Sequence, residues 1–512
     1  MERFRMQWMA VLVVWGLFTH MPVALAQEKE APKPAEAPPK TGPGQVMVLS
    51  IQESILLGLK NNLDVVIEGF NPKIRETDIT AAKAVFDPVA FLELNSDISR
   101  KQNRSALARV NITEDRNLDL NTGLRQKLPT GATYELRLDS NRNETNTSFL
   151  QGTNPAYTSN ATLTLTQPLL KNFGVDINRV QIKIAQNDRE ISLDRFRQKT
   201  MDVITQIQTT YWELVFALEN LKVQERSLRL ARELAELNRA RVRAGVAAPV
   251  EVTQAEAEVA AREGDVIVAE KGVRDAEDRL KVVLNLPKEG EWGGIILPAD
   301  PASFSPVTLD LPQVVTDALR KRPEYQAAKV DLGNRELTLR FARNQLLPDL
   351  SFQASVGLNG LGGNYEEDTD KLGSGDFYTA SAGIVLTIPL GNRAARAEFL
   401  KAQLEEEQAK VSLRNLELQI TAEVREAVRR VEADTKRVDA TKAARVLAEE
   451  QLRIEQKRLE AGVSTTFEVL RFQRDLAAAQ ANEVKVLTDY NKSLATLDRV
   501  RGVVLEKHRI QL

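Results

Sequence analysis

The hydrophobic pattern of the chain changes twice from strand-like to helix-like. "LTLTQPLLKNFG" begins at Leu163 with alternating apolar and polar residues, passes Pro168, and gives way to a long charged stretch with helical spacing. "IVLTIPLGNRAA", which begins at Ile384 and contains Pro389, does the same. Alternation with a period of two is typical of a half-buried strand, whereas a period near 3.6 indicates a helix. The pattern therefore predicts two strand-to-helix changes, each at a Thr-x-Pro-Leu step.

These two changes belong to a longer internal duplication. Four ordered matches between the halves support it. They are Leu49 with Leu309 and Pro88 with Pro348 at an offset of 260, Thr166–Leu169 with Thr387–Leu390 at 221, and Ala244–Val246 with Ala461–Val463 at 217. A period of this length indicates a duplicated domain rather than a short solenoid repeat. Each copy is predicted to run helix, strands, long helix, turn, helix.

The strand region of the first copy is the longer one. "NLDLNTGLRQKL" and "ATYELRLDS" both alternate, and the Pro129-Thr130-Gly131 step between them signals a tight turn. The pattern predicts four strands here, at about 90–100, 116–128, 132–143 and 158–168, and two in the second copy. Alternatively, the additional hairpin is an external loop.

The helical stretches have coiled-coil spacing. Apolar residues recur every seven positions: Val252, Val259, Val266, Val273 and Leu280, flanked by Ala255, Ala269, Ala276 and Val283. A helix from Asn178 to Ala244 would be roughly 100 Å long at about 1.5 Å per residue, so it needs antiparallel partners of similar length. We expect the Pro249–Leu286 helix to stack end to end on a 309–347 helix, and a 466–506 helix on a 49–86 helix.

Composition excludes several kinds of chemistry. The 69 basic and 71 acidic residues nearly balance, so no nucleic-acid partner is expected. The chain has no cysteine and only two histidines, His20 and His508. We therefore expect no metal site, no cofactor and no enzymatic activity.

The first residues have the pattern of an export signal. Arg3 and Arg5 precede an apolar run from Met9 to Phe18, and Ala24-Leu25-Ala26 is a cleavage pattern. Residues 1–26 are thus predicted to be a signal peptide, and 27–46 a disordered, Pro-rich leader. No later segment is apolar enough for a membrane helix, so renewed entry into a bilayer would require a closed β-barrel.

With these features in place, the chain resembles the TolC family of outer-membrane channel proteins from Leu49 to about Val504. "NQLLPDLSFQASVGL" is similar to the family's entry into the barrel, and "LTLTQPLL" and "IVLTIPLG" to its barrel-to-helix exits, marked by Pro168 and Pro389. "RVRAGVAAPVEVTQAEAEVAA" and "KRLEAGVSTTFEVLRFQRDLAAA" resemble its two helix-hairpin tips. Their order and duplication make the resemblance specific.

The resemblance implies an α+β membrane protein that acts as a homotrimer. Three chains would build a trimeric β-barrel in the outer membrane of a Gram-negative bacterium, in contact with its lipid, continued by a long periplasmic α-helical coiled-coil tunnel. It implies a passive exit duct of a tripartite efflux or type I secretion system. Its partners would be a periplasmic adaptor (membrane fusion) protein and an inner-membrane pump of the RND, ABC or MFS type.

The resemblance divides the mature chain into two repeats around a linker. Their expected segments are short helices at 47–88 and 309–348, barrel strands at 89–168 and 349–389, helical hairpins at 169–287 and 390–506, a linker at 288–308 and a tail at 507–512.

The resemblance also assigns candidate site residues. The adaptor-docking tips would be Gly245, Val246, Gly462, Val463, Ser464 and Thr465. Glu468 would point into the narrow end of the tunnel as part of a periplasmic gate, with Glu251 as its counterpart in the first repeat. Where the family has a second acidic residue, this chain has Arg471, which makes the cation selectivity of the gate an open question.

The strand count departs from the family pattern of two strands per copy and a 12-stranded trimeric barrel. With four strands in the first copy and two in the second, a trimer would have 18 strands and a wider pore.

Two other classes of protein fit the pattern less well than the channel. An exported structural coiled coil or adhesin would explain the seven-residue spacing but not the paired strand-Pro-helix changes. A pump adaptor has one helical hairpin rather than two duplicated ones.

Overall fold

A computed structural model describes residues 46–102, 110–147, 152–286 and 294–511. Contacts divide the chain into one unit of Met1–Val46 with Pro287–Ile295 and another of Met47–Leu286 with Ile296–Leu512. Nearly all described residues belong to the second unit. The predicted signal peptide, most of the leader and part of the 288–308 linker lie outside the described residues.

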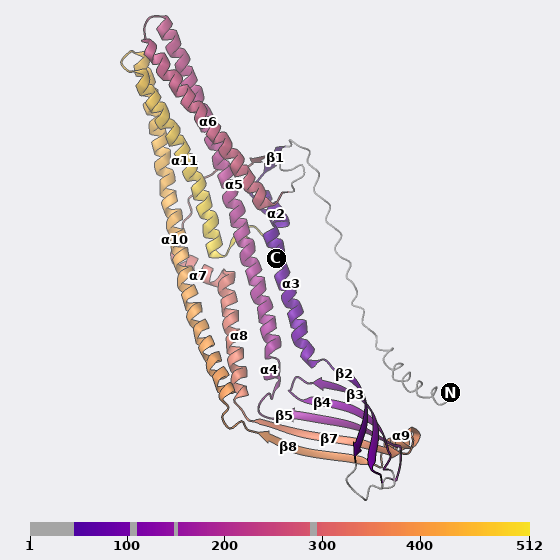
Figure 1. The fold of residues 1–512 in the computed structure, drawn as a ribbon. Coiled ribbons are helices and arrows are strands. Elements are labelled where there is room, and N and C mark those ends of the chain that lie inside the picture. The colour runs from indigo at the N-terminus through magenta and orange to yellow at the C-terminus, as the bar shows by residue number, and fades with distance from the viewer. Residues whose placement is uncertain (1–45, 103–109, 148–151, 287–293, 512) are drawn as a thin grey trace, which may run out of the picture. The chain divides into compact units, whose positions relative to one another are not determined.

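The strands of both repeats form one antiparallel sheet (Figure 1). Its six strands, in the order β2-β3-β4-β5-β7-β8, are β2 (Val89–Gln102), β3 (Ile112–Lys127), β4 (Thr133–Thr145), β5 (Ala156–Pro168), β7 (Asp349–Gly362) and β8 (Tyr378–Thr387). The prediction of four strands in the first repeat is therefore confirmed, and the additional hairpin is paired with the rest of the sheet. A separate two-stranded sheet joins β1 (Val46–Leu49) to β6 (Ile295–Pro298).

The helices follow the duplicated order. Those of the first repeat are α2 (Ile51–Asn61), α3 (Leu63–Lys83), α4 (Val175–Asn178), α5 (Val180–Arg243) and α6 (Pro249–Leu284). Those of the second are α7 (Leu311–Lys321), α8 (Pro323–Gln345), α9 (Tyr365–Ser374), α10 (Arg393–Glu460), α11 (Thr466–Arg501) and α12 (Val504–Lys507). A short 3-10 helix, η2 (Ala84–Phe86), precedes the sheet. Among the described residues, no helix has the length and apolar character needed to cross a membrane.

The first helix of each repeat is broken at equivalent positions. Asn62 and Arg322, 260 positions apart, both leave helical geometry with ψ near 120°. Asn62 caps α3 by accepting hydrogen bonds from the N–H groups of Asp64 and Val65. Arg322 precedes Pro323, and a residue before proline disfavours helical geometry. The single helices predicted at 49–86 and 309–347 are therefore two helices each.

The expected end-to-end stacking is wrong in its choice of partners. α6 meets α2 of its own repeat, where Asn62 Nδ2 donates to the Val283 carbonyl (2.9 Å) and Asn285 Nδ2 donates to the Asn61 carbonyl (2.9 Å). α11 likewise meets α7, and Arg501 pairs with Asp317 at 3.2 Å. α6 and α11 have similar apolar spacing, so the sequence pattern could not predict which short helix each one meets. The polar contacts at the helix ends join α6 to α2 and α11 to α7.

Each repeat has its own hydrophobic core beside its long helix. Ile204, Ile207, Tyr211 and Leu214 of α5 are fully buried against α2 and α6, and Ile420, Val424 and Tyr490 lie at the centre of the second core. In α6 the alanine line of Ala255, Ala269 and Ala276 is buried. The valine line beginning at Val252 is only half-buried.

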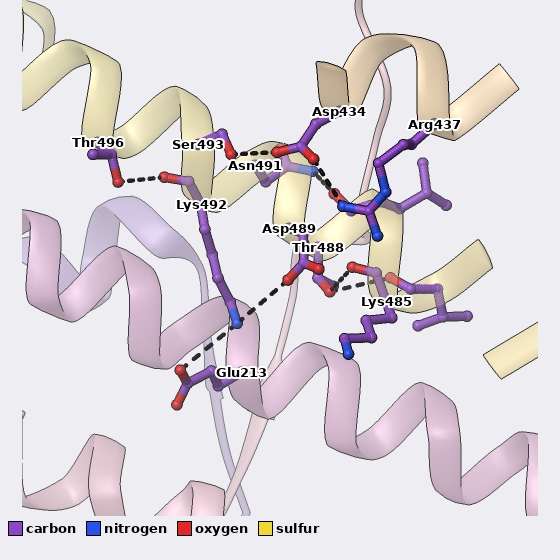
Figure 2. A network of polar contacts seen from close by, with 12 residues as sticks. Glu213, Asp434, Arg437, Lys485, Thr488, Asp489, Asn491, Lys492, Ser493 and Thr496 are labelled. Carbon is purple, nitrogen blue, oxygen red and sulfur yellow. Dashed lines mark hydrogen bonds and ion pairs between the residues drawn. The ribbon is translucent and has the colours of Figure 1, made fainter. Parts of the chain in front are cut away.

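Helix α11 joins the two long helices (Figure 2). Ser493 Oγ donates to the buried Asp434 carboxylate of α10 at 2.5 Å, and Arg437 pairs with that same carboxylate at 3.0 Å. On its other side, the Lys492 ammonium lies 3.6 Å from Glu213 of α5. The contacts with Asp434 fix α11 on α10 within the second repeat, and the Lys492–Glu213 pair connects that repeat to the first.

Candidate functional site at the hairpin tips

The two helical hairpins turn in the same way. Gly245 and Gly462, at φ +71° and +70°, follow the long helices α5 and α10. The Val246 N–H donates to the Arg241 carbonyl (3.0 Å), and the Val463 N–H donates to the Arg458 carbonyl (2.9 Å). This is a Schellman C-cap, in which glycine adopts the left-handed geometry that other residues disfavour. The sequence predicted both turns at these residues.

The turns present apolar side chains to solvent. Val246 is 66% and Val463 is 65% exposed, and Val250 (57%) and Phe467 (53%) lie one turn further on. Sequence reasoning named the first pair and missed the second. The 217-residue offset relates Val250 to Phe467 just as it relates Val246 to Val463, so alignment of the repeats could have found them.

Glu251 has a partner in the other repeat. Thr466 Oγ1 donates to its carboxylate at 2.7 Å, and Thr466 is almost fully buried. Asn238 of α5 is also buried, donates to the Glu251 carbonyl at 3.3 Å and accepts from Thr466 Oγ1 at 3.3 Å. We call the set of Asn238, Glu251 and Thr466 the tip clamp. Neither Asn238 nor Thr466 was expected from the sequence.

Two of the predicted docking residues make hydrogen bonds within the second turn. Ser464 Oγ donates to Glu455, a buried residue of α10 that also pairs with Arg458 at 3.0 Å. Thr465 is the N-cap of α11 and accepts from the Glu468 N–H at 3.4 Å. Their hydroxyls thus hold the shape of the turn, while the valines project from it.

Glu468 and Arg471 form an ion pair within α11. The guanidinium and carboxylate are 3.0 Å apart at i,i+3 spacing, and both side chains are partly exposed. The Arg471 guanidinium also lies 4.8 Å from the centre of the Phe472 ring. The structure thus brings Glu468 and Arg471 together, whereas Glu251 is engaged in the tip clamp.

The two prolines mark strand ends but not helix starts. Pro168 is the last residue of β5, and Pro389 follows the end of β8 at Thr387. The helices begin only at Val175 and Arg393. Between each proline and its helix the chain turns away from the sheet through residues with positive φ, Asn172 and Gly174 in the first repeat and Asn392 in the second.

No cluster of three or more His, Asp or Glu side chains suited to a metal ion occurs within the described ranges.

A family profile described as "Outer membrane efflux protein" matches residues 129–286 and 314–503. The chain belongs to this family. It is a family of outer-membrane channels rather than enzymes, and membership places the chain in the outer membrane. The resemblance to TolC-like channels seen in the sequence is confirmed, and nothing in the comparisons supports the adhesin alternative.

Curated relatives are about a quarter identical to the chain over the stretches that align. The pyoverdine export outer membrane protein OpmQ of Pseudomonas putida is 26% identical over 326 residues, which cover 61% of this chain and 65% of OpmQ, just under two thirds of its length. Nodulation protein T of Rhizobium leguminosarum bv. trifolii is 24% identical over 350 residues, covering 68% of this chain and 72% of that protein.

Solved structures share the fold at lower identity. The CmeC outer membrane channel of Campylobacter jejuni superposes with a TM-score of 0.64 at 16% identity, covering 88% of this chain and 85% of CmeC. The open state of the MtrE channel of Neisseria gonorrhoeae gives 0.61 at 18% identity, covering 90% and 91%.

Proposed function

We propose that three copies of this chain form a passive exit duct from the periplasm to the outside. The duct is the outer-membrane component of a tripartite efflux or type I secretion system. The single observation that carries this is the two-faced sheet joined to helical hairpins. One sheet face carries exposed leucines such as Leu92, Leu136 and Leu163, and the other carries residues such as Asn121, Asp139 and Asn160. An apolar face toward lipid and a polar face toward water are what a membrane pore requires.

The contacts between repeats support the assembly of several copies. α11 and α8 of the second repeat pack on α5 of the first. By the duplication, the equivalent packing would place α6 and α3 of the first repeat on α10 of the second. Within the described part of one chain, α6 and α3 do not pack on α10 in this way. Apolar side chains are left exposed on both sides: Ile67, Phe70 and Ile267 on α3 and α6, and Leu404, Val411 and Leu418 on α10. A second copy supplies the missing contact and buries these residues.

The hairpin tips are the proposed docking surface for a periplasmic adaptor protein. Val246, Val250, Val463 and Phe467 offer two equivalent apolar patches per chain, and exposed apolar patches mark protein-protein contacts. The adaptor in turn links the duct to an inner-membrane pump of the RND, ABC or MFS type, which supplies the energy.

The ion pair of Glu468 and Arg471 is proposed to line the periplasmic gate. Threefold repetition places three such pairs in one constriction. Because each carboxylate is matched by a guanidinium 3.0 Å away, the gate favours cations less than a ring of carboxylates alone would.

The decisive experiment is to purify the mature chain from outer membranes and record it in planar bilayers. A trimer in detergent with stable single-channel currents is expected. A monomeric protein, or bilayers that stay electrically silent, would refute the duct.

A further inference from the structure

The apolar face of the sheet continues through all six strands. Direct partners in antiparallel strands point to the same side, so rows can be followed across the register. One row is Ala90, Leu124, Leu136, Leu163, Val356 and Ala380, and the next is Leu92, Thr122, Leu138, Ala161, Leu358 and Tyr378. A polar row on the opposite face is Glu93, Asn121, Asp139, Asn160 and Asn359. β2 and β3 therefore have the same two faces as the other four strands.

Because the apolar face of β2 and β3 continues that of the other strands, its exposure distinguishes a hairpin that lies in the membrane from one that lies in water. Leu92, Leu94 and Ile98 of β2 are each about two-thirds exposed. In water such a row of exposed leucines costs free energy and promotes aggregation, whereas in lipid it is stabilising. The β2–β3 part of the sheet thus has the surface of a segment surrounded by lipid.

The turn between β3 and β4 is attached where the sheet joins the helices. The Gly174 N–H donates to the Thr130 carbonyl at 3.0 Å. Gly131, at φ +95°, packs so closely that an added Cβ would lie 2.3 Å from the Asn172 carbonyl oxygen. Asn178 Nδ2 donates to that same carbonyl at 2.7 Å. The additional hairpin is therefore built into the junction between the sheet and the helices.

We propose that all six strands of each chain enter the membrane, so that three copies close an 18-stranded barrel through β8 of one copy and β2 of the next. The inference rests on the proposed trimeric duct and adds its pore size. β2 and β8 are the two edges of the sheet, and they run in opposite directions, as antiparallel closure requires.

The duplication gives the register of the closing pair. Inside one chain, β5, the last strand of the first repeat, pairs with β7, the first strand of the second, and Leu163 lies opposite Val356. The 221-residue offset carries Leu163 to Ile384, and the 260-residue offset carries Val356 back to Ser96. The equivalent contact between copies places Ile384 of one opposite Ser96 of the next.

The consequence is a wide, polar lumen. Barrel diameter grows roughly linearly with strand number, so 18 strands give a pore about 1.5 times as wide as 12, in the range where porins hold an aqueous channel. The lumen face bears Glu93, Asp119, Arg137 and Asp139 beside many amides and hydroxyls. Such a pore suits bulky, hydrated polar cargo.

The chain has no cysteine, which allows a direct test by crosslinking. The double variant Ser96→Cys with Ile384→Cys is oxidised in intact outer membranes, and non-reducing gels are expected to contain covalent trimers that a thiol reductant dissolves. Each single variant is expected to give none. The matched double variant Leu138→Cys with Ile384→Cys probes a 12-stranded barrel, in which β4 would close on β8, and is expected to stay uncrosslinked.

The outcomes separate the two proposals. Trimers that crosslink only through Leu138→Cys with Ile384→Cys, or through neither pair, overturn the 18-stranded barrel and leave the duct standing. A chain that is monomeric in detergent overturns the duct itself.

Discussion

Thr466 of the second repeat donates a 2.7 Å hydrogen bond to Glu251 of the first, across 215 positions of sequence. With Asn238 it fastens the tip of one hairpin to the other. If the duct opens by separating its hairpins, this clamp has to break. We therefore expect substitutions in these three side chains to change the conductance of the duct.

Replacing Thr466 by valine is expected to loosen the tips. Valine keeps the shape of threonine but removes the hydroxyl that bonds both Glu251 and Asn238, and such a loss costs about 1–3 kcal/mol at a buried site. Faster amide exchange at 244–252 and 461–469, together with a larger single-channel conductance, would follow.

The control for this substitution is Thr441→Val. Thr441 is a half-exposed residue of α10 whose hydroxyl donates to the Arg437 carbonyl of its own helix at 2.9 Å. Its replacement should leave the tips and the conductance as they are. Equal effects from both variants would remove the clamp from gating.

Arg471 is expected to mask the charge of Glu468. Arg471→Ala should increase cation preference and block by multivalent cations, because it frees the carboxylate from its 3.0 Å partner. Glu468→Gln should reduce both. The exposed Glu450–Arg453 pair has the same i,i+3 spacing, so Glu450→Gln and Arg453→Ala are matched controls. Unchanged currents in both Glu468 and Arg471 variants would place that pair outside the gate.

Introducing charged residues into the apolar patches at the hairpin tips is expected to abolish export without closing the pore. Val246→Asp with Val463→Asp should prevent adaptor binding, measured by crosslinking in cells, while purified protein conducts as before. Val307→Asp, at an exposed valine in a loop remote in sequence from both tips, should leave binding intact. Adaptor crosslinking that survives the double substitution would show that docking uses another surface.

Gly131→Ala is expected to destabilise the junction between sheet and helices. Alanine at φ +95° is strained by about 1–3 kcal/mol, and its Cβ would collide with the Asn172 carbonyl oxygen. A lower dissociation temperature of the trimer on gels is the measurement. Gly152, whose added Cβ would meet open space, is the control position, and Gly152→Ala should behave as the parent protein.

The partly buried His508 makes stability depend on pH. Its Nδ1 lies 3.0 Å from Gln52 Oε1 and its Nε2 lies 3.0 Å from Gln208 Nε2, and the neutral ring satisfies both contacts when Nδ1 donates and Nε2 accepts. Burial first, and then the Lys507 charge, lowers the pKa of His508 below its usual 6.5, against a smaller opposing effect of Asp498.

The unfolded chain therefore takes up this proton before the folded one does. The stabilisation is complete above pH 6.5 and is lost as the pH falls from there through the lower folded-state pKa of His508. Thermal unfolding at pH 8 and at about pH 5.5 should differ less for His508→Gln than for the parent chain. An identical pH dependence in both would contradict the assignment.

Local pattern was enough for much of the architecture. The alternation in "LTLTQPLL", the seven-residue spacing from Val252 onward and the glycines at 245 and 462 each depend on a period or a backbone conformation that neighbouring residues set by themselves. The duplication then implied that the same elements recur, and the four strands between Val89 and Pro168 follow the alternation directly.

Tertiary structure decided which elements and side chains pack together, which the local sequence pattern did not specify. Either returning helix could have stacked on either short helix, since both have the same spacing, and the polar joint at Asn62 and Asn285 selected one arrangement. Glu251 is the counterpart of Glu468 in the duplication, but no local pattern indicated that Thr466, 215 positions away, would donate a hydrogen bond to its carboxylate. Periodicity records which face of an element is apolar; it holds no information about which partner covers that face, and that choice is made by contacts between residues far apart in the chain.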